Sequence, residues 1–201
     1  GGRPPQINVS VSLFIPKPFT PFQWEEKLPM EESERRIMLL RKRLTSSGIG
    51  FKWHDPKMSA VEAAFSRGDR RLSRVLLAAF KKGARLDGWG EEFSFSIWQE
   101  AFSDCGLDMG FYGQRKRPFE ETLPWDHLDA GIEKKFLWKE YENALELKET
   151  ADCKTDKCYC CGVCDHKVIK NIIAKEMPQE KAAGPAGGGA PSYKIRLVYS
   201  K

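Results

Sequence analysis

Apolar and polar residues alternate with a period of two in two segments of the chain, as in a strand with one buried face. The alternation covers residues 7–15 near the start and residues 193–199 near the end, and we predict a strand in each. Residues 49–55 are a shorter candidate strand. Because a single strand is not stable alone, we expect the first to belong to a sheet whose other strands are missing from this chain.

Apolar residues spaced by three and four predict helices between these strands. The predicted helices cover about residues 31–47, 60–68, 69–83, 94–105 and 129–147, followed by a short one at 167–176. Ser59 and Glu62 fit a capping box that would start the second helix at Ala60. We expect Cys105 to be a small buried core residue. The side chains predicted to face the core include Ile37, Leu40, Leu44, Leu72, Val75, Leu76, Ala79, Phe80, Ile97, Trp98, Ala101, Phe102, Ile132, Phe136, Tyr141, Ala144 and Leu145.

These elements predict a mainly α fold with a few short strands, of the α+β class. We divide the chain into a strand and proline-rich loop (1–30), a helical region (31–176), a Pro/Gly/Ala-rich flexible linker (177–192) and the first strand of a truncated further domain (193–201). The chain has 201 residues, of which 41% are hydrophobic, enough for a packed core. Its apolar runs are far shorter than the roughly 18 residues of a membrane span, so we expect no membrane association.

The loop of residues 16–24 holds three prolines and the aromatic residues Phe19, Phe22 and Trp24. Proline excludes helix and the interior of a sheet, so this segment is extended. One interpretation is a loop whose aromatic side chains are pinned onto a core. The other is a loop over a ligand site at the C-terminal end of the preceding strand, where such sites concentrate. The sequence leaves both open.

Five of the six cysteines lie within residues 153–164. Cys153, Cys158, Cys161 and Cys164 form the pattern C-x4-C-x2-C-x2-C, with Gly162 available for a tight turn. Cysteines this close rarely meet the geometry of disulfides, whereas their thiolates can converge on one metal. The pattern therefore predicts a metal knuckle over residues 152–166. Clustered cysteines without a secretory leader also lead us to expect a reducing, cytoplasmic location.

The metal itself is left open by the spacing. Zn²⁺ suits a closed tetrahedral thiolate site, and C-x4-C-x2-C also matches the spacing of iron–sulfur ligands. Cys160 is a spare or a substitute ligand. His166 could replace one thiolate, although we interpret it as an exposed residue at the start of a helix. Four nearby lysines would offset the negative charge of the thiolates: Lys154, Lys157, Lys167 and Lys170.

Basic residues gather in the helix at 31–47 and in the loop Arg115–Arg117, and the net charge is +5. With the cysteine knuckle they suggest an alternative function, an RNA-binding module with structural zinc. Arg67, Asp69, Arg70 and Arg71 form either ion pairs, which we favour, or an anion site at a helix start. His54 and His127 each adjoin an aspartate, but adjacency in sequence is no sign of a catalytic dyad.

Six sequence blocks, in order, resemble the C-terminal part of the radical SAM proteins that carry an N-terminal cobalamin-binding domain. The resemblance spans Val9 to Cys164, about three quarters of the chain. The blocks are FIPKPFTPFQW (14–24), WHDP (53–56), RGDRR (67–71), DGW (87–89), PWDHLD (124–129) and DCKTDKCYCCGVCD (152–165).

The resemblance implies that residues 7–15 are the last strand of a radical SAM barrel, with the proline-rich loop near the barrel mouth. Residues 31–176 would be a helical accessory region carrying the knuckle, and the partners would be the barrel and the cobalamin domain. S-adenosylmethionine and cobalamin belong to the parent family. This chain departs from the family in lacking C-x3-C-x2-C, because residues 154 and 157 are both lysine. We therefore expect no catalysis from this chain alone, and an iron–sulfur cluster or zinc at the knuckle.

Overall fold

The structure is a computed structural model that describes residues 6–46, 48–154, 157–169 and 194–196. Contacts divide the chain into two compact units. Unit 1 comprises Gly1–Pro18, Gln23–Trp125 and Ser192–Lys201, and unit 2 comprises Phe19–Phe22 and Asp126–Pro191. The predicted linker at 177–192, residues 170–176 of the last predicted helix and most of segment 193–201 lie outside the described residues.

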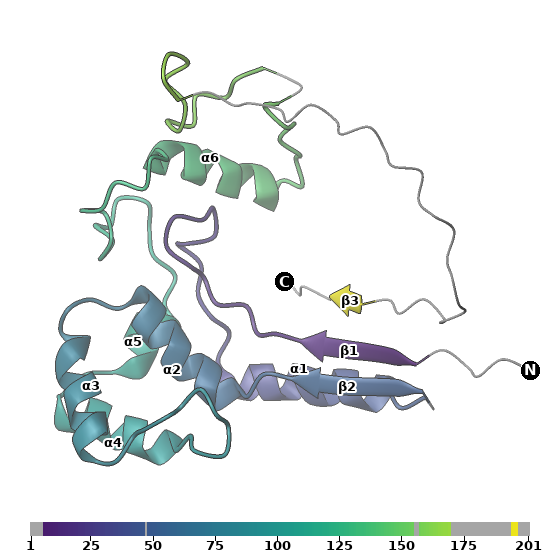
Figure 1. Cartoon of the computed structure of the whole chain (residues 1–201), viewed down its shortest axis with the longest axis vertical. Coiled ribbons are helices and arrows are strands. Elements are labelled where there is room, and N and C mark those ends of the chain that lie inside the picture. The colour runs from purple at the N-terminus through teal and green to yellow at the C-terminus, as the bar shows by residue number, and fades with distance from the viewer. Residues whose placement is uncertain (1–5, 47, 155–156, 170–193, 197–201) are drawn as a thin grey trace, which may run out of the picture. The chain divides into compact units, whose positions relative to one another are not determined.

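A small parallel sheet occupies one end of unit 1, in the strand order β2-β1-β3 (Figure 1). Its strands are β1 (Ile7–Val11), β2 (Ile49–Trp53) and β3 (Lys194–Arg196), and each lies within a segment predicted as a strand. β1 pairs with β2 in the register Ile7↔Ile49, and with β3 in the register Asn8↔Lys194. The expectation that the sheet partners of β1 are missing is therefore corrected, since both neighbours come from this chain.

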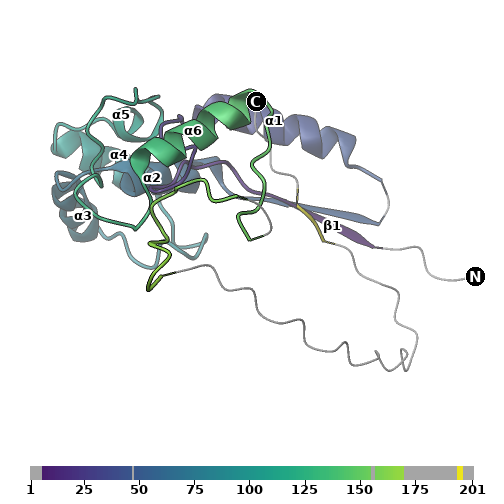
Figure 2. The same cartoon turned by 90° about the horizontal axis from the view of Figure 1, so that it is seen from above.

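β1 ends at Val11 instead of reaching Ile15, because its partner strand stops there. The Val11 carbonyl oxygen accepts the His54 amide at 3.1 Å, and the helix α2 begins two residues later at Pro56. Between the strands runs α1 (Met30–Arg43), which makes β1-α1-β2 a strand–helix–strand unit. α1 lies along the sheet (Figures 1 and 2), where Val9, Val11 and Ile37 are buried.

The main hydrophobic core of unit 1 lies among α2 (Pro56–Arg67), α3 (Leu72–Lys81), α4 (Phe95–Asp104) and α5 (Met109–Gly113). α5 was not predicted. Its five residues are too few for a periodic pattern, and it begins where the Asp108 carboxylate accepts the amides of the next turn. The core residues are Val61, Ala64, Leu72, Val75, Ala79, Trp98, Ala101, Phe102 and Tyr112.

The predicted start of α2 at Ala60 is wrong by one turn. Asp55 caps the helix by accepting the Lys57 amide at 2.7 Å, and Pro56 occupies the first helical position, where its missing N–H costs nothing. Ser59 is therefore buried inside the helix and does not cap it.

Three residues predicted to face a core point to solvent instead. Leu76 and Phe80 of α3 are 54% and 53% exposed, because Leu72, Val75 and Ala79 form the buried stripe of that helix. Leu145 is also exposed. Cys105 is half-buried and packs at the edge of the main core, close to its predicted role.

Unit 2 is built on α6 (Lys134–Leu145), whose Leu137 and Tyr141 are buried. Phe22, from the proline-rich loop, packs edge-on against Tyr141 with 5.7 Å between ring centroids. In unit 1, Trp24 from the same loop is fully buried beside Phe119. These two contacts agree with the interpretation of the loop as a segment pinned by its aromatic side chains.

Candidate functional site

The cysteine segment brings one predicted ligand close to a histidine. The Sγ atom of Cys158 lies 3.4 Å from Nε2 of His166 and accepts the backbone amide of Cys160 at 3.3 Å. Backbone N–H groups donated to a thiolate sulfur stabilise its negative charge, as the outer shell of a metal site does. Cys158 thus has both a potential co-ligand and a supporting donor.

A tight turn holds His166 in this position. The Asp165 carboxylate accepts the amides of Lys167, Val168 and Ile169 at 2.8–2.9 Å, and these bonds lower the pKa of Asp165 below its usual range. The Ile169 carbonyl in return accepts the His166 amide at 3.0 Å. Residues 166–169 are bent and not helical, so the predicted helix start at His166 is not seen in the described residues.

The middle of the segment packs closely against the start of α6. The amide of Glu133, which precedes the helix, donates to the Cys161 carbonyl at 2.8 Å. Gly162 has a φ of +93°, and a Cβ atom added there would lie 2.9 Å from Cγ of Glu133. Glycine is therefore needed at this position both for its backbone conformation and for space.

The four predicted ligands differ in exposure. Cys153, Cys158 and the neighbouring Cys160 are exposed, whereas Cys161 and Cys164 are half-buried. Among the residues that the structure describes, no group of three or more His, Cys, Asp or Glu side chains is arranged to hold a metal. The structure does bring Cys158 and His166 together. The sequence pattern favoured the four cysteines as metal ligands and gave His166 only as a possible replacement for one of them.

The spacing of that pair suits a tetrahedral metal. Zinc bonds of about 2.3 Å to sulfur and about 2.0–2.1 Å to nitrogen place two ligands of a tetrahedral centre roughly 3.5 Å apart. The observed distance between Sγ of Cys158 and Nε2 of His166 is 3.4 Å. Thiolate and imidazole are also the donors that zinc prefers.

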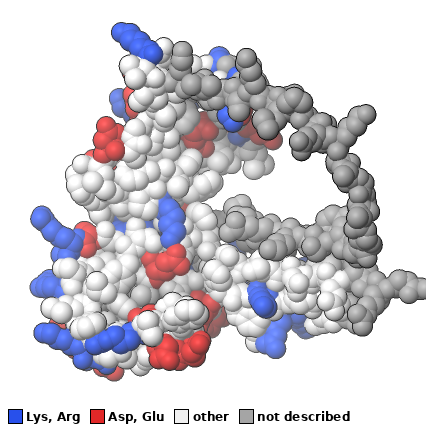
Figure 3. All heavy atoms as spheres, viewed as in Figure 1, with Lys and Arg blue, Asp and Glu red and all other residues white. Residues whose placement is uncertain are grey.

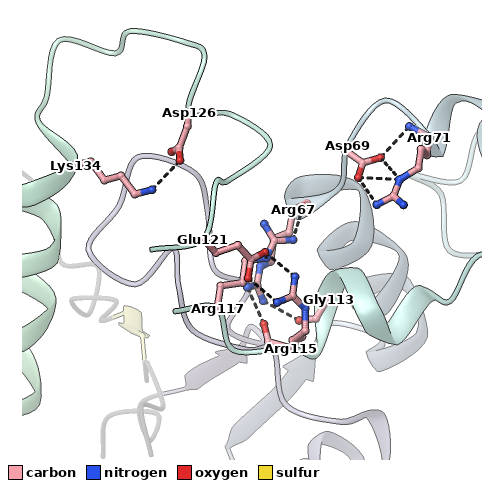
Figure 4. Close-up of polar contacts among 9 residues, drawn as sticks. All are labelled: Arg67, Asp69, Arg71, Gly113, Arg115, Arg117, Glu121, Asp126 and Lys134. Atoms are coloured by element: carbon pink, nitrogen blue, oxygen red, sulfur yellow. Dashed lines mark hydrogen bonds and ion pairs between the residues drawn. The ribbon is translucent and has the colours of Figure 1, made fainter. Parts of the chain in front are cut away.

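A second cluster, in unit 1, consists of buried arginines (Figure 4). Arg67, at the end of α2, is fully buried and donates to the carbonyl oxygens of Gly113 and Arg115, both at 3.0 Å. Arg117 is 2% exposed and donates to the Arg67 carbonyl at 2.7 Å. Burial, with the charges of Arg117 and Arg115 second, lowers the pKa of Arg67 to about 10. These bonds tie α2 to the last residue of α5 and to the chain that follows it.

Three other basic residues of this region, Arg71, Arg115 and Lys116, form ion pairs. Arg115 makes two hydrogen bonds to Glu121, at 2.6 and 2.7 Å, and Lys116 pairs with Glu25 at 2.9 Å. Asp69 pairs with Arg71 at 2.7 Å, which confirms an ion pair at this junction (Figure 4). Over the lower helices in Figure 3, basic and acidic side chains are interspersed. The RNA-binding hypothesis stays a prediction, with its basic loop engaged in internal contacts.

Both histidines next to aspartates, His54 and His127, are exposed. The aspartates have other roles, since Asp55 caps α2 and Asp126 pairs with Lys134 at 2.7 Å. The structural interpretation of these two positions is therefore favoured over a catalytic one.

Comparison of the chain with models of protein families, with curated proteins and with solved structures finds no match. The resemblance to radical SAM proteins accordingly rests on the six sequence blocks. Among the described residues, no helix has both the length and the apolar character that crossing a membrane requires.

Proposed function

We propose that this chain is a C-terminal accessory part of a radical SAM iron–sulfur enzyme, and that residues 152–166 bind a metal. The first half of the proposal is supported by the six sequence blocks. The second half is carried by one observation, the approach of Cys158 Sγ to His166 Nε2 at 3.4 Å. The chain itself is proposed to be non-catalytic, because it contains no C-x3-C-x2-C triplet for a catalytic cluster.

The proposed metal ligands are Cys153, Cys158, Cys161 and Cys164. His166 is the candidate to replace one of these cysteines. A fourth ligand that is imidazole favours zinc, because the usual iron–sulfur clusters are held by cysteine thiolates. The metal would join residues 158 and 166 across the turn that Asp165 closes. It would also fix the loop that Cys161 attaches to the start of α6, which is a structural role.

Metal analysis of anaerobically purified protein tests this proposal. We expect about one zinc per chain, as in closed structural sites. Cys158→Ser should lose at least half of the bound zinc, and His166→Asn should weaken zinc binding in competition with a chromogenic chelator. Cys105→Ser is the matched control, because Cys105 is a half-buried thiol of unit 1, and it should retain zinc fully.

Two other outcomes of the metal analysis would each change the proposal. A brown protein absorbing near ~400 nm, with iron and sulfide in place of zinc, would assign an auxiliary iron–sulfur cluster and remove His166 from the ligand set. Equal metal content in the wild type, Cys158→Ser and Cys105→Ser would show that the segment binds no metal specifically, and would overturn the metal half of the proposal.

A further inference from the structure

A cavity of about 320 Å³ lies in unit 1 where β1 ends. Its walls come from the chain leaving β1 and from one side of α1, and most of the lining side chains are apolar. The lining includes Val11, Leu13, Leu28, Ile37 and Leu40, together with Lys27. The carboxyl end of a parallel strand is a common position for ligand sites, and this volume is at the small end of the range for such sites.

Lys27 is the unusual member of this lining. Its side chain is 1% exposed, and its ammonium group donates to the Leu28 carbonyl at 3.0 Å. An ammonium group can donate three hydrogen bonds, and a buried charge is normally paired. Among the described residues, no carboxylate lies within ion-pair distance of its Nζ atom. Burial lowers the pKa of Lys27, opposed by the more distant charge of Glu31.

The other two cations of the lining already share a carboxylate of the chain. Arg35 and Arg36 both contact Glu32, at 2.7 and 2.6 Å, and the Ser33 hydroxyl donates to the Pro29 carbonyl at 2.9 Å. Lys27 is therefore the cation in this lining that still lacks a charged partner among the described residues. A ligand that satisfies the cavity has an apolar body and a single negative charge.

We propose that this cavity binds a small amphipathic carboxylate, with its apolar part against the side chains of Val11, Ile37 and Leu40 and its carboxylate on the Lys27 ammonium group. A monoanion fits better than a phosphate, because a dianion would need more donors than this lining leaves available. The proposal is independent of the metal proposed for unit 2.

Titration calorimetry of the whole chain with three probes of one length tests the charge requirement. We expect octanoate to bind saturably, 1-octanol at least tenfold more weakly, and octylammonium without measurable heat of binding. Lys27→Met should reduce the affinity for octanoate to that for octanol while leaving octanol binding unchanged. Lys42→Met, which removes an exposed lysine of α1, is the control and should bind octanoate like the wild type.

A second variant covers the case in which Lys27→Met does not fold. Leu40→Trp keeps the ammonium group but fills the cavity from α1, and it should lose binding of both octanoate and octanol. Equal affinities for octanoate and octanol in the wild type would overturn the proposal. The proposal would also be overturned if neither probe bound saturably, or if Leu40→Trp still bound octanoate.

Discussion

The arginines of unit 1 come from two short basic segments (67–71 and 115–117) and the cysteines of unit 2 from one segment (153–164), but the structure uses them in opposite ways. Arg67 and Arg117 are almost completely buried, and their guanidinium groups donate to backbone carbonyl oxygens. The thiol groups of Cys153, Cys158 and Cys160 are exposed. The first cluster is stabilised by groups of the chain, whereas the second is held by local turns.

This difference shows that the density of chemically active residues does not indicate what they do. A buried polar group is normally hydrogen-bonded, and Arg67 and Arg117 donate to interior backbone carbonyl groups. The Nε atoms of both residues and Nη1 of Arg117 have no hydrogen-bond partner among the described residues. Exposed thiols close to a histidine have no such structural requirement to meet. The approach of Cys158 to His166 is the contact on which the proposed metal rests, which is why we place the candidate function in unit 2.

The largest effect should come from the core on which unit 1 depends. Phe102 is 3% exposed and meets Phe65 edge-on, so Phe102→Ala should lower the free energy of unfolding by about 3–5 kcal/mol. Urea denaturation followed by circular dichroism measures this change. Phe80→Ala is the control, since Phe80 is 53% exposed, and it should cost no more than about 1 kcal/mol. Equal losses would contradict the assignment of the core.

Removing a buried arginine should have the next largest effect. Arg67→Met removes the hydrogen bonds to Gly113 and Arg115. The Arg115 carbonyl loses this donor and the Gly113 carbonyl keeps only the Lys27 amide, so we expect a loss of about 2–4 kcal/mol. The same denaturation experiment on Arg71→Met is the comparison, because Arg71 is exposed and pairs with Asp69 at the surface. If Arg67→Met were as mild as Arg71→Met, the buried cluster would not hold unit 1 together.

The fold was predictable where a periodic pattern is long. The strands at Ile7–Val11 and Ile49–Trp53 follow from alternation or β-rich composition, and five helices follow from apolar spacing. The pairing of β1 with β2 was not predictable, because nothing local specifies which strands meet. The position of Arg67 could have been found: it lies three, four and seven residues after Ala64, Ala63 and Ala60, on the buried face of α2.

The candidate metal site was predictable only as a set of residues. Spacing identifies the cysteines, but which ligands converge depends on turns that spacing does not encode. The turn that brings His166 to Cys158 depends on three amides donated to Asp165 and on a positive φ of 60° at His166. Lys27 carries no periodic pattern that would mark it as buried.

Gly162 offers a smaller and more local test of unit 2. Gly162→Ala places a Cβ atom 2.9 Å from Glu133 Cγ and strains a backbone with φ of +93°, so the loop should detach from the start of α6. Hydrogen exchange of the Glu133 amide should then accelerate, and zinc affinity should fall. Gly83→Ala is a matched control, because Gly83 also has a positive φ of 104° but has nothing within 4 Å of an added Cβ. It should strain α3 by about 1–2 kcal/mol and leave zinc binding unchanged.

The smallest effect concerns the buried cation of unit 1 and its response to pH. Burial lowers the pKa of Lys27, so the folded chain releases this proton at a lower pH than the unfolded chain does. Between the folded pKa and the unfolded value near ~10.4, the unfolded state binds more protons, and stability therefore rises with pH. The stability of the wild type relative to Lys27→Met should rise accordingly in urea denaturation at pH 7, 8, 9 and 10.

For Lys82, the contribution to stability should change with pH in the opposite direction in the same experiment. Hydrogen bonds to Glu100 and Asp104 raise its pKa, so its contribution is complete below the unfolded pKa and is lost only as pH rises through the folded value. The difference between wild type and Lys82→Met should therefore stay level from pH 7 to 9 and fall at higher pH. A level difference for Lys27→Met across the whole range would mean that its ammonium group is as well solvated as that of Lys82. The requirement for an anionic partner in the cavity would then disappear.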